Sequence, residues 1–271
     1  MADGMQAEKC RSPFLQGLIH ALAVGIFWLS GSSLSAQTME AGVFAGGSYY
    51  LGDLNPGRQF QNYQIAYGVL ARYDINDRWA VKLSGYRGTV KGNSSQSTFL
   101  PDRDLSFTSS VTDISAVAEF NFFDFYIGSR KNWITPYIYT GFSFFLFNPK
   151  NGGVSLRELG TEGQNVGYDG RKPYKTYSFG IPFGLGVKIS LTQRLGLTVF
   201  WEMHKTFTDY LDDVSTTYPA VPDKYSDPTG TYTEGMQRGN SRNNDWYSFS
   251  GVTLTYKFNL ISRRRCRDLE H

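Results

Sequence analysis

The stretch that decides the fold is KTYSFGIPFGLGVKIS, residues 175–190. Its odd-numbered positions from Tyr177 to Ile189 are all apolar, and its even-numbered positions are mostly glycine, serine, threonine or lysine. Successive side chains of a β-strand point to opposite faces, so this period of two predicts a strand with one apolar face and one small, polar face.

Seven more stretches have the character of strands. They are residues 39–51, 63–75, 79–88, 108–122, 134–147, 194–204 and 246–258. In the second of these, Ile65 and Val69 alternate with Gln64 and Arg72. The stretch 134–147 is aromatic on both faces, so its sequence does not tell which side points inward. We therefore predict an all-β chain of eight strands.

The two faces indicate the kind of barrel. The polar face carries small and charged residues such as Gly184, Lys188 and Glu119. The interior of an eight-stranded barrel is only wide enough for side chains, so this face fits a lumen and the apolar face would meet lipid. A soluble lipocalin-like barrel would explain the strands but not this composition. We predict an eight-stranded antiparallel transmembrane outer-membrane β-barrel.

The connections between these stretches alternate in length. The gaps at 52–62, 89–107, 148–174 and 205–245 are long, whereas those at 76–78, 123–133 and 191–193 are shorter. Outer-membrane barrels have long extracellular loops and short periplasmic turns. The alternation therefore predicts that both ends of the chain are periplasmic, and a soluble barrel does not account for it.

Two further local features carry predictions. Aromatic residues near strand ends are expected to form the two interface girdles of such a barrel. They are Trp79, Trp133, Tyr137, Trp201, Tyr210, Trp246 and Tyr247. Pro182 lies inside a strand and cannot donate a hydrogen bond to the ladder, so a bulge or an irregular site is expected there.

The first 36 residues are predicted to be a secretory signal peptide. Two bases precede an apolar run at 14–29, and small residues follow up to Ala36. The apolar run is shorter than the roughly 20 residues of a transmembrane helix. The barrel would then occupy residues 37–260, followed by a basic periplasmic tail at 261–271 whose last three residues resemble a tag remnant.

Chemistry-bearing residues are few. The net charge of +3 does not indicate a nucleic-acid partner. His204, followed by Asp209, Asp212 and Asp213, is the candidate group for catalysis, which needs a nucleophile and an orienting acid within reach. The aspartates lack the spacing and glycine of a calcium loop, so we expect a solvated or loop-capping acidic cluster instead. We predict no enzyme activity, cofactor or metal.

Basic residues are concentrated where periplasmic contacts would lie. Four arginines stand within five residues of the tail, at Arg263, Arg264, Arg265 and Arg267. Arg130 and Lys131 stand in the predicted turn at 123–133. Together they are predicted to form a basic patch that binds an acidic protein partner, with a solvated tail as the alternative.

Several blocks of the chain resemble the PorG family, the outer-membrane barrels of the type IX secretion system. The blocks are 40–56, 147–150, 159–164, 181–186 and 205–215, and they span nearly all of residues 37–260. The positions that match the family's most distinctive motifs are Gly52, Asp53, Thr206, Asp209, Tyr210, Asp212 and Asp213.

The resemblance implies a non-enzymatic part of a protein-export machine. Its expected partners are outer-membrane lipid and the periplasmic ring formed by the lipoprotein PorK and the protein PorN, which the barrel would anchor or organise. Two other functions remain open. One is a small barrel enzyme using His204, and the other is a ligand or adhesion barrel that acts through its long loops.

Overall fold

The computed structural model describes residues 38–96, 101–220 and 222–259. The predicted signal peptide at 1–36 and the predicted tail at 261–271, with Arg263, Arg264, Arg265 and Arg267, lie outside the described residues. Among the described residues, no helix has the length and apolar character to cross a membrane.

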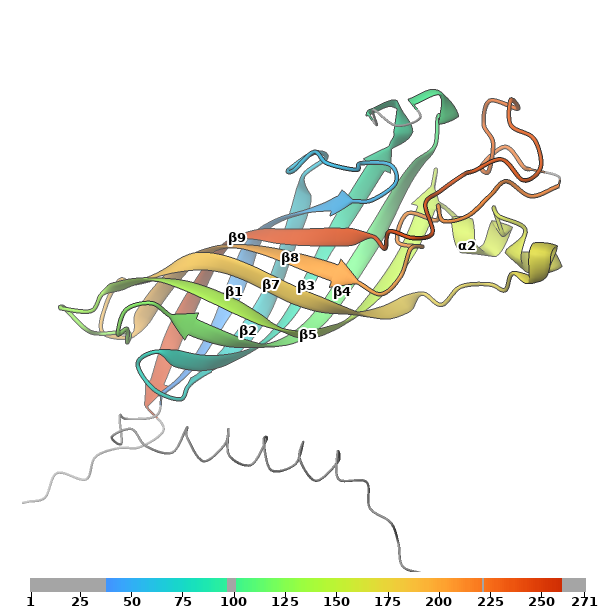
Figure 1. The fold of residues 1–271 in the computed structure, drawn as a ribbon. Coiled ribbons are helices and arrows are strands. Elements are labelled where there is room, and N and C mark those ends of the chain that lie inside the picture. Colours follow the sequence, from blue (N-terminus) through green and yellow to red (C-terminus); the bar gives the residue numbers. More distant parts are fainter. Residues whose placement is uncertain (1–37, 97–100, 221, 260–271) are drawn as a thin grey trace, which may run out of the picture. The chain divides into compact units, whose positions relative to one another are not determined.

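Eight long strands form the fold. They are β1 (Thr38–Leu51), β2 (Gln64–Asp74), β3 (Trp79–Asn93), β4 (Ser106–Asn121), β5 (Ile134–Asn151), β7 (Tyr177–Ser190), β8 (Leu195–Thr206) and β9 (Trp246–Asn259). A two-residue strand, β6 (Val154–Ser155), pairs with the end of β5. All neighbours are antiparallel in the order β4-β3-β2-β1-β9-β8-β7-β5, and a β4–β5 pairing closes the ring (Figure 1). The predicted eight-stranded barrel is confirmed.

The connections contain only short helical segments. They are α2 (Leu156–Leu159) and the 3-10 turns η1 (Ser94–Gln96), η2 (Pro101–Arg103), η3 (Gln164–Val166) and η4 (Tyr168–Gly170). The longest connections, 152–176 and 207–245, lie at one end of the barrel, here called the long-loop end (Figure 1). Thr38 pairs with Asn259, so both ends of the described barrel lie at the opposite, short-turn end.

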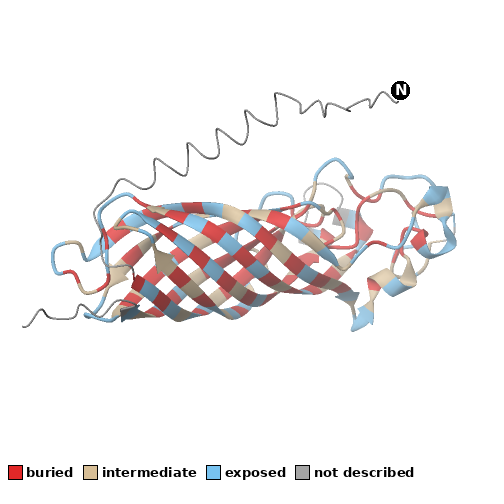
Figure 2. Cartoon of the chain, turned by 90° about the horizontal axis from the view of Figure 1, so that it is seen from below, coloured by how far each residue is buried: buried red, intermediate tan, exposed pale blue. Residues whose placement is uncertain are grey.

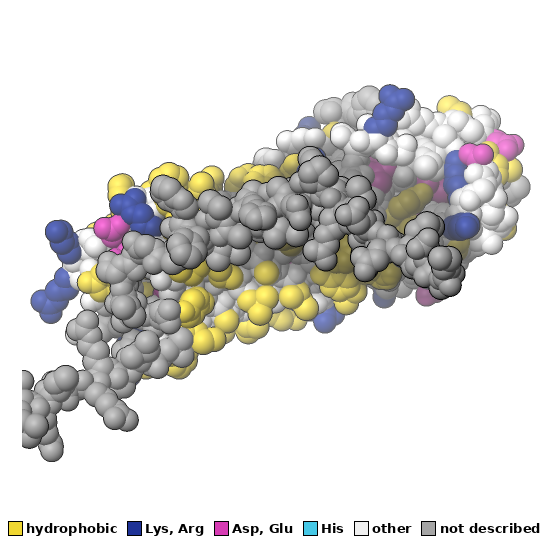
Figure 3. Space-filling model, turned by 60° about the horizontal axis from the view of Figure 1, so that its bottom comes forward, with side chains coloured by type: hydrophobic (Ala, Val, Ile, Leu, Met, Phe, Trp, Pro, Cys, Tyr) yellow, Lys and Arg dark blue, Asp and Glu magenta, His cyan; other side chains and the backbone are white. Residues whose placement is uncertain are grey.

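The barrel wall is apolar outside, and its interior holds charged and polar side chains together with buried aromatic rings. On β7, Phe179 and Leu185 are 58% and 55% exposed, whereas Lys188 is 1% exposed. Figure 2 shows this alternation as stripes along every strand, and Figure 3 shows apolar side chains along the wall of the barrel. Apolar side chains on the outside of a closed barrel are suited to lipid rather than water. The chain therefore has the fold of an outer-membrane barrel.

The inward face of β5, which its sequence left open, is set by the neighbouring strand. Tyr137 and Tyr139 point inward, and they occupy the space beside Gly186 and Gly184 of β7. A Cβ at Gly184 would lie 2.6 Å from the Tyr139 ring. The glycines that made β7 readable as a strand thus also make room for the large side chains of β5.

The predicted girdle is wrong for three of its seven aromatics. Tyr137 and Tyr247 are buried inside the barrel, and Tyr210 lies in a long loop with its ring 4.5 Å from that of Tyr174. Trp79 and Trp133 are exposed at the short-turn end, as predicted. The position of an aromatic residue near a strand end therefore does not predict whether its ring points outward to the membrane or inward to the lumen.

Pro182 interrupts the ladder without a bulge. The β5–β7 pairing runs from Ile134 to Thr140, is absent for the next two residues, and resumes at Ser143 in the same register. On its other side Pro182 stays opposite His204 of β8. Of the two predicted alternatives, the irregular site is confirmed and the bulge is not. The ladder has a gap where proline lacks a backbone N–H to donate.

Candidate functional site

A network of buried charges crosses the lumen around Glu119. Arg72 Nε lies 2.8 Å and Lys188 Nζ 2.6 Å from Glu119 Oε2. Arg72 also contacts Glu40 at 2.6 Å, which links β1, β2, β4 and β7. Each of these side chains is at most 3% exposed. Buried charges persist only when they are paired and hydrogen-bonded, so this network holds the four strands together.

A second part of the network lies beside the first. Lys82 Nζ lies 3.4 Å from Glu202 Oε2 and 4.0 Å from Glu119 Oε1. The same ammonium group lies 4.3 Å from the centroid of the Tyr139 ring, within cation–π range. Phe44 and Phe200 then pack ring against ring at 5.3 Å. Charged groups and aromatic rings together fill the lumen at this level, as expected for an eight-stranded barrel.

His204 belongs to this lumen network. Its Nε2 lies 2.8 Å from Glu202 Oε1, and its Nδ1 lies 3.3 Å from Ser143 Oγ and 3.6 Å from Asp113 Oδ2. Its charged partners are therefore Glu202 and Asp113. They are not the loop aspartates that follow His204 in the chain. A serine, a histidine and an acid do stand in a row, but His204 and Glu202 are 0% exposed in a filled lumen. The arrangement suits a structural role.

The long loops build a second polar core, the loop cap, from the connections 152–176 and 207–245. At its centre Arg238 Nη1 lies 3.0 Å from Glu162 Oε1, and both side chains are buried. Glu162 also accepts the backbone N–H groups of Ser215 at 2.8 Å and Thr216 at 3.0 Å. The Glu162 carboxylate thus helps to fix the 207–245 loop to the 152–176 loop.

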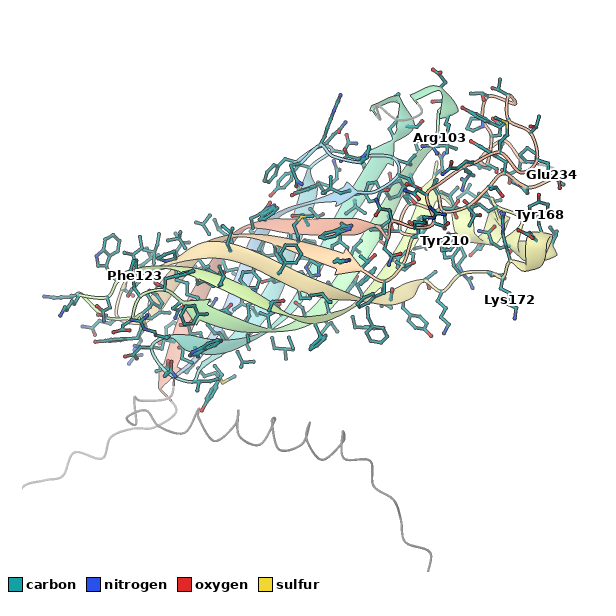
Figure 4. All side chains as sticks on the ribbon, in the orientation of Figure 1. Arg103, Phe123, Tyr168, Lys172, Tyr210 and Glu234 are labelled. Carbon is teal, nitrogen blue, oxygen red and sulfur yellow. The ribbon has the colours of Figure 1, made fainter. Side chains whose placement is uncertain are left out.

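The motif residues of the PorG-like blocks come together at this cap. Asp213 accepts hydrogen bonds from Thr161 and from Tyr174 at 2.6 Å, while Tyr210 stacks on Tyr174. Figure 4 labels Tyr210 and Arg103 at this end of the barrel. Arg103 donates to the carbonyl of Arg238. These contacts draw η2 and both long loops into one body.

The remaining motif residues join the cap to the rim of the barrel. Tyr50 at the end of β1 donates a hydrogen bond to Asp212. The Asp53 carboxylate accepts the backbone N–H of Asn240 at 2.6 Å. A Cβ at Gly52 would lie 2.1 Å from both the Tyr50 hydroxyl and the Asp245 carboxylate. A larger residue at position 52 would have to displace the Tyr50 and Asp245 side chains, so Gly52 has a steric reason for its place in the motif.

Thr206 and Asp209 are the last two of the seven motif residues. Thr206 Oγ1 donates to the carbonyl of Asp245 at 2.6 Å, at the point where β8 enters the long loop. Asp209 is 7% exposed. All seven motif residues therefore lie in or beside the loop cap, and each contact described for them is structural.

Burial raises the pKa values of four aspartates of the cap. Burial raises the pKa of Asp209 to about 9, and burial raises that of Asp213 to about 6 although Arg238 acts in the opposite direction. Burial also raises the pKa values of Asp212 and Asp245 well above the usual range. Desolvation thus disfavours the charged forms. In residues 38–96, 101–220 and 222–259, no three His, Cys, Asp or Glu side chains are placed to hold a metal ion.

The short-turn end carries the predicted basic residues that the structure describes. Arg130 and Lys131 are exposed in the turn between β4 and β5. Arg130 borders a groove of about 490 Å³. The groove is lined by Gly128, Ser129, Arg130, Trp133, Ser190, Leu191, Thr192 and Gln193. The two bases are thus accessible beside a concave surface at the end opposite the loop cap.

The sequence placed Glu119 on the inward polar face and Glu162 in the PorG-like block 159–164, but it predicted no partner for either residue. Glu119 carried no motif, and the partners Glu162 and Arg238 are 76 residues apart in the chain. A partial signal existed for Glu162, which lies between Gly160 and Gly163. Both glycines adopt positive φ values, of 68° and 77°. A lone acid in such a tight turn commonly bonds to the backbone.

Solved barrels of similar architecture share little sequence with this chain. The N-terminal β-barrel domain of OprF from Pseudomonas aeruginosa is 12% identical with a TM-score of 0.38, covering 83% of this chain and 98% of that chain. Neisserial surface protein A is 13% identical with a TM-score of 0.43, covering 84% and 100%. The outer membrane protein OprG from Pseudomonas aeruginosa is 13% identical with a TM-score of 0.38, covering 83% and 97%.

Family membership rests on a different comparison. No curated protein matches the chain. The family model described as "Domain of unknown function (DUF6089)" matches residues 19–263, which include every described strand. The chain therefore belongs to the DUF6089 family.

Proposed function

We propose that this barrel is a non-enzymatic outer-membrane component of the type IX protein secretion system, similar to PorG, and that it anchors or organises the periplasmic ring of the export machine. The observation that carries the proposal is the convergence of the motif residues. Asp53 of one PorG-like block and Asp212 and Asp213 of another all take part in the loop cap. Shared motifs that build one substructure favour shared architecture over chance similarity.

The filled lumen supports an anchoring role over a conducting one. The ion pairs of Glu119 and the rings of Phe44 and Phe200 occupy the space through which a substrate would pass. Folded protein cargo is far wider than the interior of an eight-stranded barrel. We therefore assign the transport path to other components of the machine.

In the proposed orientation the short-turn end faces the periplasm. Arg130 and Lys131 are then exposed toward the ring, beside the groove at Trp133. The predicted arginine tail follows β9, whose last described residue lies at the same end. An acidic surface on PorK or PorN would complement these charges. His204 has no catalytic role in this proposal, and no cofactor is assigned.

Reversing the charge of the short-turn end should release the ring. We expect the double variant Arg130→Glu, Lys131→Glu to recover about tenfold less PorK and PorN in mild-detergent purification than the unaltered protein. Like charges would then face each other across the contact. The measurement is quantitative mass spectrometry of the purified complex, normalised to the barrel.

The matched control reverses two bases at the long-loop end, Lys172→Glu with Lys224→Glu, both of them exposed. This control should retain the ring proteins. Ring recovery that is equal in both variants and in the unaltered protein would contradict the proposal. Loss in the control alone would favour a loop-binding function instead. The groove of about 520 Å³ beside Asp53 and Trp246 offers space for that function.

A further inference from the structure

Along the outward face of β3, β4 and β5, the side chains change from apolar to polar within a few rows of paired residues. Leu83, Ala116 and Phe142 stand side by side in one row, followed by Gly85, Ile114 and Phe144 in the next. Phe142 is 77% and Ile114 56% exposed. These rows belong to the apolar band that faces the hydrocarbon of the membrane.

The next rows toward the long-loop end are polar. They consist of Arg87, Thr112 and Leu146, then Thr89, Ser110 and Asn148, then Lys91, Thr108 and Lys150. All of these side chains are on the outward face, because their neighbours along each strand are buried in the lumen. The barrel wall therefore leaves the hydrocarbon at about the row of Arg87, where Tyr67 and Tyr177 flank the row on adjacent strands.

Three cations stand in these polar rows. In the described parts of the chain, neither Arg87, Lys91 nor Lys150 makes an ion pair or a side-chain hydrogen bond. Lys175 adds a fourth charge close by, because its Nζ lies 5.3 Å from the centroid of the Tyr177 ring and Tyr177 pairs with Leu146 of the Arg87 row. We call Arg87, Lys91 and Lys150 the basic shelf.

One residue of the basic shelf, Lys150, lines a groove that offers neutral hydrogen-bonding groups. The groove has a volume of about 480 Å³. Its lining includes Thr89, Ser106, Thr108, Ser110, Asn148, Lys150 and Asn151. Hydroxyl and carboxamide groups beside ammonium groups suit a sugar that carries a phosphate better than they suit a phosphate alone.

We propose that the basic shelf and its groove bind the phosphorylated sugar headgroup of a glycolipid in the membrane leaflet at the long-loop end. The position supports this ligand, since side chains on the outer wall directly beyond the apolar band lie at the level of lipid headgroups. The charges supply the affinity for phosphate, and the groove supplies partners for sugar hydroxyls. The identification of this leaflet as the outer one rests on the orientation given in the proposed function. The binding site itself does not depend on that orientation.

The test uses the full chain purified in detergent and lipid A, a diphosphorylated glucosamine disaccharide lipid, as the probe. The triple variant Arg87→Gln, Lys91→Gln, Lys150→Gln should bind lipid A about tenfold more weakly or worse, because each surface cation adds to the attraction for an anionic lipid. The control variant Lys172→Gln, Lys224→Gln, Arg242→Gln removes equal charge from exposed loop positions. It should bind as the unaltered protein does.

Three further ligands identify the source of the phosphate. The unaltered protein should prefer lipid A over phosphatidylglycerol and over lipid A stripped of both phosphates, and inorganic phosphate should not compete at millimolar concentration. Equal binding by the triple variant and the unaltered protein would overturn the proposal, and so would equal or tighter binding of phosphatidylglycerol or of the stripped lipid. Gel migration with and without heating checks that each variant is folded. No ring protein is present, so failure here leaves the anchoring proposal untouched.

Discussion

Replacing Glu119 by alanine should lower the free energy of unfolding of the barrel by about 3–5 kcal/mol. Glu119 is 0% exposed and lies between Arg72 and Lys188, with Lys82 at 4.0 Å. Removing it leaves three buried cations with fewer counter-charges, and the loss of a partner in a buried network costs far more than the loss of a surface pair. Repulsion among the cations adds to the effect.

The measurement is equilibrium unfolding in detergent, followed by tryptophan fluorescence and by gel migration. Glu158→Ala removes an exposed acid from α2 and serves as the control, with an expected change within about 0.5 kcal/mol. Glu119→Gln keeps the shape and part of the hydrogen bonding, so its effect should lie between the two. If Glu119→Ala unfolds like the control, the lumen network does not hold the strands together.

Replacing Arg238 by alanine should open the loop cap while leaving the barrel folded. Arg238 lies 3.0 Å from Glu162 and 3.6 Å from Asp213, and both acids are buried. Its loss would remove both of these ion pairs, at a cost of about 3–5 kcal/mol. The eight strands do not depend on this pair, so the destabilisation should remain local.

Chymotrypsin reports this opening, because Tyr225 and Tyr232 lie in the 207–245 loop. Cleavage of a briefly opened segment follows the population of the open form, so a loss of about 3 kcal/mol should speed cleavage of the loop by about 100-fold. Arg242→Ala, at an exposed position of the same loop, is the control. Unchanged cleavage of the Arg238 variant would show that the ion pair does not organise the cap.

Periodicity made the barrel predictable, because every second residue of a strand reports on the same face. It also could have placed His204 and Glu202 together, since they are two residues apart on β8. Periodicity did not show which face of β5 points into the barrel, because both faces of that strand are aromatic. The inward face of β5 is set by Gly184 and Gly186 on the neighbouring strand, which leave room inside the barrel for Tyr139 and Tyr137.

Sequence periodicity could not predict the contacts between loops that are far apart in the chain. Glu162 and Arg238 meet across 76 residues of chain, and neither lies in a repeating segment. The motif resemblance did single out Asp212 and Asp213, which lie at the cap. It could not show that these acids are buried and hydrogen-bonded, since burial depends on the fold of the loop and not on local spacing.

The proposed contact between the short-turn end and the ring is tested most directly by cross-linking mass spectrometry on intact membranes with an amine-reactive reagent. Lys131 is exposed at the short-turn end, whereas Lys172 and Lys224 are exposed in the long loops. The account predicts cross-links from Lys131 to PorK or PorN and none to them from Lys172 or Lys224. Cross-links to the ring proteins from the loop lysines, with none from Lys131, would contradict it.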